Sequence, residues 1–188
     1  ILREVVKNVF DEVETHDIDR AMVLASAAFI ERHPDHSFLA ARLLLQRLQK
    51  EVVGRSIKAS EHDKIYRKTF IRKTREMIER SNLDPRLGEM DLTRLAGALR
   101  PERDLQFQFL GLQTLYERYF LRLDGECAEL PQAFWMRVAM GLAVREESQH
   151  EDWAIEFYEL MSQRRFVPST PRSEERRVGK EGRSRWSP

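Results

Sequence analysis

The chain has 188 residues, of which 41% are hydrophobic and 34% charged, a composition typical of a soluble globular protein rich in helix. No apolar run approaches the roughly 18 residues that a membrane-spanning helix needs, which argues against a membrane protein. Cys127 is the only cysteine, so no internal disulfide can form, and we expect a cytoplasmic protein. The sequence opens at Ile1 without a methionine and without a signal-peptide pattern.

The formal net charge of +1 comes from the last 17 residues. Residues 172–188 hold six basic and three acidic side chains, whereas residues 1–171 hold 26 basic and 28 acidic ones. The body of the chain therefore lacks the basic excess of a protein that binds nucleic acid electrostatically. A nucleic-acid-binding function would depend entirely on residues 172–188.

The first 53 residues predict three amphipathic helices. Apolar residues recur at helical spacing over 2–13, and Asp17 is expected to cap a second helix. The segment 33–36 breaks this helix, and Ser37 is expected to cap a third helix, apolar around most of its circumference and hence central and buried. The expected inner face of the second helix consists of Ile18, Met22, Ala25 and Phe29.

The next part of the chain predicts two further helices after a linker. Residues 54–60 read as the linker, and residues 61–80 as a strongly charged helix with sparse apolar anchors, followed by a turn over 82–85. Asp91 is expected to cap a short helix that ends near Leu99. The anchors of the charged helix are Ile65, Phe70, Met77 and Ile78.

Residues 105–166 combine strand and helix patterns. Leu105, Phe107 and Phe109 alternate as in a strand, and a helix is expected from about Phe109. Asp124-Gly125 predicts a β-hairpin turn, and Pro131 suits the first turn of a helix that reaches about Glu146. A last helix is expected over 151–164, with a strand starting at 166–167.

Several residues could carry chemistry but have simpler interpretations. Glu147 and His150 form a Glu-x-x-His motif of the kind that di-iron bundles use, but the chain has no second copy, and a solvated loop is favoured. Cys127 has no neighbouring His or Cys, so we expect a packing residue. We expect no metal ligands and no catalytic residue. Five aromatic residues are expected in the core: Tyr116, Tyr119, Phe120, Phe134 and Trp135.

Ser169 and Thr170 stand between Pro168 and Pro171, directly after a predicted strand. Two hydroxyls and a backbone amide on a rigid turn suit an oxyanion such as phosphate. Without further information, a plain turn is the more common interpretation of this pattern.

The chain resembles the large subunit of class I ribonucleoside-diphosphate reductase over about residues 1–171. The segment 130–143, LPQAFWMRVAMGLA, is similar to a specific motif of that family, although Leu130 stands where the family usually has Thr. The first 53 residues resemble the back half of the family's ATP-cone, through Asp17-Ile18 and 38–43. Further similar segments are 109–119, 154–158 and 165–171.

This resemblance implies a mainly α fold: a partial ATP-cone over 1–53, a linker over 54–60, and over 61–171 the helical domain that precedes the reductase barrel, with a short hairpin. It implies thiyl-radical reduction of ribonucleoside diphosphates for DNA synthesis. It assigns Ser169 and Thr170 to substrate phosphates, and Thr15 and Lys50 to nucleotide contacts in the cone. Lys50 also reads as an ordinary surface lysine.

The partners implied by the resemblance are a radical-generating small subunit, thioredoxin or glutaredoxin, and a second copy of the large subunit. ATP and dATP are the family's allosteric effectors, and we expect no bound cofactor, nucleic acid or membrane. The family's catalytic cysteines would follow residue 171, so we expect an inactive fragment. The alternative is a helical protein–protein interaction module without catalysis.

Residues 172–188 resemble the in-frame translation of a common sequencing adapter, with Gly182 where that translation has Cys. We therefore expect an artefactual and disordered tail.

Overall fold

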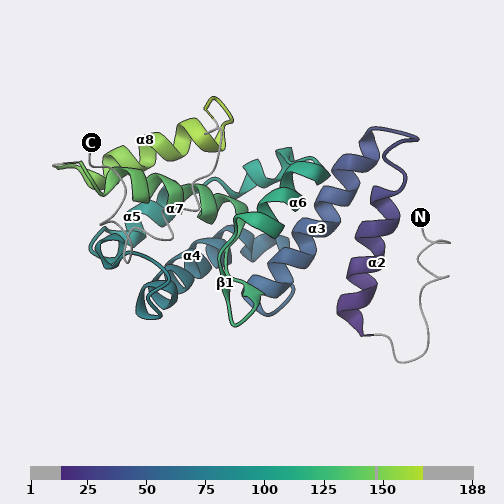
Figure 1. The fold of residues 1–188 in the computed structure, drawn as a ribbon, viewed down its shortest axis with the longest axis horizontal. Coiled ribbons are helices and arrows are strands. Elements are labelled where there is room, and N and C mark those ends of the chain that lie inside the picture. The colour runs from purple at the N-terminus through teal and green to yellow at the C-terminus, as the bar shows by residue number, and fades with distance from the viewer. Residues whose placement is uncertain (1–13, 147, 167–188) are drawn as a thin grey trace, which may run out of the picture. The chain divides into compact units, whose positions relative to one another are not determined.

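The computed structural model describes residues 14–146 and 148–166, and these are mainly helical with one two-stranded hairpin (Figure 1). The predicted fold class is therefore confirmed. The helix predicted over 2–13 and the tail predicted over 172–188 lie outside the described residues. Among the described helices, none combines the length and the apolar character that crossing a bilayer demands.

The chain divides into two compact units. Among the described residues, the first combines 14–60 with 102–131, and the second combines 61–101 with 132–146 and 148–166. The domains predicted over 1–53 and 61–171 were defined by family resemblance in sequence, whereas these two units are defined by packing. The predicted domains therefore stay predictions.

Helix α3 (Asp35–Val53) is the centre of the first unit. It packs against α2 (Thr15–Ala27) on one side and α6 (Phe109–Arg118) on another (Figure 1). Gly54 follows it with a φ of 83°, the left-handed conformation that commonly ends a helix. The prediction of a buried central helix is confirmed by its six buried residues, which are Ala40, Ala41, Leu44, Leu45, Leu48 and Val52.

Both predicted helix caps in the first unit are wrong. Helix α2 begins at Thr15, so Asp17 lies inside the first turn, where its charge complements the helix dipole. Helix α3 begins directly after Pro34, because a proline is tolerated where a helix starts. Ser37 therefore lies in the first turn, and its Oγ accepts a hydrogen bond from the amide of Phe109 at 3.2 Å, which fixes the start of α6 on α3.

The buried face of α2 also differs from the prediction. Val23 and Ser26 are the buried residues of this helix. The four residues predicted for the inner face are only partly buried. The face that α2 turns to α3 is thus rotated by about one residue from the apolar stripe in the sequence.

The hairpin is confirmed. Strands β1 (Arg122–Leu123) and β2 (Glu126–Cys127) pair antiparallel. Asp124 and Gly125 have φ of 52° and 89°, the positive values that a two-residue turn with the twist of a hairpin requires.

The strand predicted around Leu105–Phe109 is wrong. Residues Pro101–Gln106 form the 3-10 helix η3. An isolated strand leaves its backbone groups unpaired, and in the described part of the chain the only sheet is the β1–β2 pair. A helical turn satisfies the same groups locally.

The second unit contains α4 (His62–Glu79), which follows the short 3-10 helix η1 (Ala59–Glu61). It also contains η2 (Pro85–Gly88), α5 (Leu92–Ala98), α7 (Pro131–Ala143) and α8 (His150–Ser162). The predicted cap of α5 is confirmed, because Asp91 Oδ1 accepts from the amides of Thr93 at 2.9 Å and Arg94 at 3.0 Å. Helix α7 ends three residues before the predicted Glu146.

Two fully buried tyrosines hold the second unit together. Tyr66 Oη accepts a hydrogen bond from the amide of Gln132 at 2.9 Å. Tyr158 Oη donates to Gln132 Oε1 at 2.9 Å and accepts from the amide of Arg100 at 2.8 Å. Both rings are 0% exposed, so these bonds are made in a site that water does not reach.

Candidate functional site

The structure brings Thr15 and Lys50 to the same end of the α2–α3 pair. Thr15 is the first residue of α2, and Lys50 lies in the last turn of α3. Lys50 Nζ contacts Asp19 Oδ2 at 2.7 Å, and Asp19 is four residues after Thr15 and hence on the same helix face. The two residues predicted to contact a nucleotide therefore share one surface.

The start of α2 carries further carboxylates. Glu14 and Asp17 contact the two ring nitrogens of His16 at 2.9 and 3.3 Å. Asp19 occupies one of the three N–H donors of the Lys50 ammonium. A phosphate could use the remaining donors together with the exposed hydroxyl of Thr15.

The other predicted binding residues lie outside the described residues. These are Ser169 and Thr170. Glu147 of the Glu-x-x-His motif, for which a solvated loop is expected, also lies outside them. His150 opens α8, and its Nε2 lies 2.7 Å from the carbonyl oxygen of Glu146. In residues 14–146 and 148–166, no three His, Cys, Asp or Glu side chains gather in a way that could hold a metal ion.

Cys127 is a packing residue, as predicted. Its side chain is buried at 2% exposure, and its Sγ donates to the carbonyl oxygen of Glu129 at 3.4 Å. Burial raises the pKa of the thiol to about 12. A thiol that stays protonated at neutral pH is a poor nucleophile and a poor source of reducing electrons.

The aromatic residues predicted for the core divide into two groups. Phe120, Phe134 and Trp135 are buried, whereas Tyr116 and Tyr119 are partly exposed. Burial, followed by the hydrogen bond to Glu51, raises the pKa of Tyr116. The Tyr116 hydroxyl donates to Glu51 Oε2 at 2.9 Å, and its ring lines a cavity that the sequence interpretation missed.

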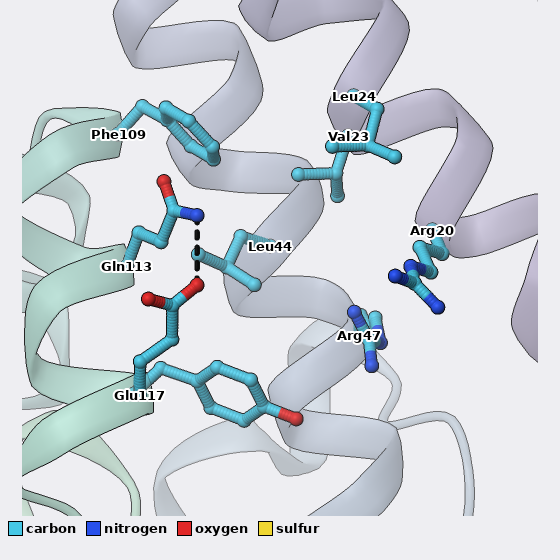
Figure 2. Close-up of a pocket in the computed structure, with 9 residues that line it drawn as sticks. Arg20, Val23, Leu24, Leu44, Arg47, Phe109, Gln113 and Glu117 are labelled. Atoms are coloured by element: carbon cyan, nitrogen blue, oxygen red, sulfur yellow. Dashed lines mark hydrogen bonds between the residues drawn. The ribbon is translucent and has the colours of Figure 1, made fainter.

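This cavity, called here the α2–α3–α6 groove, has a volume of about 250 Å³ (Figure 2). Its position follows from helical spacing, because each helix contributes residues three or four apart. The sequence shows this spacing within each helix, but it does not show which helices pack against one another. The lining residues are Arg20, Val23, Leu24, Leu44, Arg47, Phe109, Gln113, Tyr116 and Glu117.

Comparison with known proteins identifies relatives over most of the chain. Residues 105–172 match the family model described as the ribonucleotide reductase all-alpha domain. The ribonucleoside-diphosphate reductase subunit alpha of Chlamydia muridarum is 42% identical over 165 residues, which are 87% of this chain and 16% of that protein. The large chain of Schizosaccharomyces pombe is 35% identical over 173 residues, 91% of this chain and 20% of that protein.

Over most of its length, the chain is similar to members of the ribonucleotide reductase large-subunit family. A vertebrate member, the large subunit of Danio rerio, is 30% identical over 171 residues. The chain spans about a sixth to a fifth of the length of these relatives. The resemblance inferred from the segment 130–143 and its neighbours is therefore confirmed.

Proposed function

We propose that this chain serves as part of a ribonucleoside-diphosphate reductase large subunit, which reduces ribonucleoside diphosphates to deoxyribonucleoside diphosphates by thiyl-radical chemistry. The observation that carries the proposal is the similarity over 87% of the chain to a protein that bears this name. The matched all-alpha domain at 105–172 supports it. In the alternative function, these helices form a protein–protein interaction module without catalysis.

The residues of this chain would bind nucleotides rather than perform the radical step. Ser169 and Thr170 would hold the substrate's phosphates, and Thr15 and Lys50 would contact ATP or dATP as allosteric effectors. Cys127 is unsuited to the cysteine chemistry, because it is buried and protonated. Other cysteines would supply the thiyl radical and the reducing dithiol, so the 188-residue chain alone should give no turnover.

The assembly that this function requires has several partners. A separate small subunit would generate the radical, thioredoxin or glutaredoxin would restore the dithiol, and two large subunits would form a homodimer. All of them would act in the cytoplasm, where deoxynucleotides are made.

A substitution at Thr170 tests the substrate site. Residues 1–171 would replace the corresponding segment of the C. muridarum subunit, and Thr170→Val would be made in this chimera. A hydrogen bond to a charged group contributes roughly 1.5–3 kcal/mol, so substrate binding should weaken about ten- to a hundredfold. Unchanged substrate affinity would show that 168–171 is only a bend flanked by prolines.

A substitution at Lys50 tests the effector site independently. In the same chimera, Lys50→Gln should weaken ATP binding about tenfold or more, because it removes the only lysine at this end of the described α2–α3 pair. The matched control is Lys58→Gln, an exposed lysine in the linker. Equal ATP affinity in the two variants, measured by calorimetry, would exclude Lys50 from the effector site.

A further inference from the structure

The α2–α3–α6 groove combines an apolar wall with two guanidinium groups, those of Arg20 and Arg47. In the described part of the chain, neither Arg20 nor Arg47 forms an ion pair with a carboxylate. Arg47 is anchored over the ring of Tyr116, with 5.8 Å from its guanidinium carbon to the ring centroid. Figure 2 shows Arg20 and Arg47 reaching into the same space from α2 and α3. Two guanidiniums that converge on one cavity are suited to a carboxylate, which they bind through paired N–H donors.

The wall on the α6 side carries an acceptor. Gln113 Nε2 donates to Glu117 Oε1 at 2.8 Å, one helical turn away, as Figure 2 shows. This bond orients the carboxylate, and in residues 14–146 and 148–166 its other oxygen is open to a donor. The charged residues of the groove are Arg20, Arg47 and Glu117, so its net charge is +1 and one negative charge on a ligand balances it.

The groove also has an apolar surface. Val23 and Leu44 are buried, whereas the side chain of Leu24 is 55% exposed. The ring of Phe109 lines the same cavity, and an exposed leucine there gains most when an apolar ligand covers it. The cavity volume is slightly below the range typical of drug-sized ligands, so it suits a molecule of about a dozen heavy atoms.

We propose that this groove binds a small aromatic carboxylate that carries a hydrogen-bond donor at its far end. The carboxylate lies between Arg20 and Arg47, the ring covers Leu24 and Phe109, and the donor meets Glu117. Neither Thr15 nor Lys50 lines the groove, and this proposal does not rest on the proposed reductase function.

The test uses 4-hydroxyphenylacetate and three simpler probes on the 188-residue chain. The full probe should bind with a Kd on the order of 1 mM, as expected for about eleven heavy atoms. Phenylacetate lacks the donor and should bind about threefold more weakly. Acetate lacks the ring, and 4-hydroxyphenylethanol lacks the carboxylate, so each should bind at least about tenfold more weakly. The side-chain amide resonance of Gln113 is the local NMR reporter.

Matched variants locate the site. Arg20→Gln and Arg47→Gln should each weaken binding of 4-hydroxyphenylacetate about tenfold. Arg42→Gln is the control, because Arg42 is an exposed arginine on α3 that does not line the groove. Leu24→Asn should weaken binding of 4-hydroxyphenylacetate while leaving that of acetate unchanged. An unchanged circular dichroism spectrum and melting temperature establish that each variant is folded.

Three results would overturn the proposal. The first is the absence of any shift of the Gln113 amide at about ten times the expected Kd. The second is equal affinity of the Arg20→Gln, Arg47→Gln and Arg42→Gln variants for 4-hydroxyphenylacetate. The third is equal binding of acetate and 4-hydroxyphenylacetate, which would show a nonspecific anion effect of surface arginines.

Discussion

Tyr158 donates a hydrogen bond from its buried hydroxyl to Gln132 Oε1 at 2.9 Å, which joins α8 to the first turn of α7. The same hydroxyl accepts from the amide of Arg100 at 2.8 Å. One oxygen atom therefore links three segments of the second unit that are far apart in the sequence.

Tyr158→Phe should destabilise the protein by about 1–3 kcal/mol. The substitution keeps the ring but leaves the Gln132 oxygen and the Arg100 amide without their partner in a dry site. Urea unfolding followed by circular dichroism measures the loss. A double-mutant cycle with Gln132→Leu should show that the two substitutions are not additive. Strict additivity would mean that the bond contributes nothing to stability.

Glu51 has the corresponding role in the first unit. Its Oε1 accepts from the amide of Cys127 at 2.7 Å, and its Oε2 accepts from the Tyr116 hydroxyl at 2.9 Å. Glu51→Gln should cost about 1.5–3 kcal/mol, because an amide supplies one acceptor where the carboxylate supplies two. Glu126→Gln, at an exposed position of the same hairpin, is the control and should unfold like the unmodified chain. Equal unfolding curves for the two variants would contradict this role.

The thiol of Cys127 should react only when the protein unfolds. With a pKa raised to about 12, its thiolate fraction at pH 8 is about one in ten thousand, against about one in ten for a thiol at the ordinary value of 9.0. Labelling with a thiol reagent at pH 8 should thus be about a thousandfold slower in native buffer than in urea. Fast, stoichiometric labelling of the native protein would show that the thiol is accessible.

Glu151 should make the unfolding free energy of the second unit depend on pH in the acid range. A hydrogen bond from the amide of Asp91 at 2.9 Å lowers the pKa of Glu151 below its usual 4.5. A carboxyl whose pKa is lower in the folded state stabilises the fold above its unfolded pKa, and this contribution is lost as the pH falls through the folded pKa. Glu151→Gln should therefore flatten the fall of the unfolding free energy below about pH 4.5.

The control for this titration is Glu156→Gln, at an exposed position of the same helix. This variant should lose stability on acidification as steeply as the unmodified chain. If Glu151→Gln and Glu156→Gln gave the same pH dependence, the bond to Asp91 would not contribute to acid stability.

Local patterns in the sequence predicted the elements that local physics determines. The buried α3, the Asp91 cap and the turn at Asp124-Gly125 depend on spacing and on residue type, and all three are confirmed. The predicted start of α3 is wrong because a residue distant in the sequence determines the role of Ser37. Its sequence context is typical of a cap, but its hydroxyl accepts a hydrogen bond from the amide of Phe109, 72 residues away.

The candidate sites divide in the same way. The family resemblance predicts Lys50 as a nucleotide contact. Its contact with Asp19 could not be predicted, because no local pattern specifies how α2 and α3 align. The helical spacing of Tyr116 predicts a residue of the core. In the structure its ring forms a wall of the groove beside Arg47, an arrangement that three separate helices create.

The proposed function requires that this chain can replace the matching part of an active reductase. The most direct measurement is the rate of ribonucleoside diphosphate reduction by the chimera in which residues 1–171 replace the matching part of the C. muridarum subunit, assayed with the small subunit and thioredoxin. We expect deoxynucleotide formation at a rate within about tenfold of the parent enzyme, which is a barrier difference of about 1.4 kcal/mol. A chimera that folds and dimerises like the parent but forms no deoxynucleotide would contradict it.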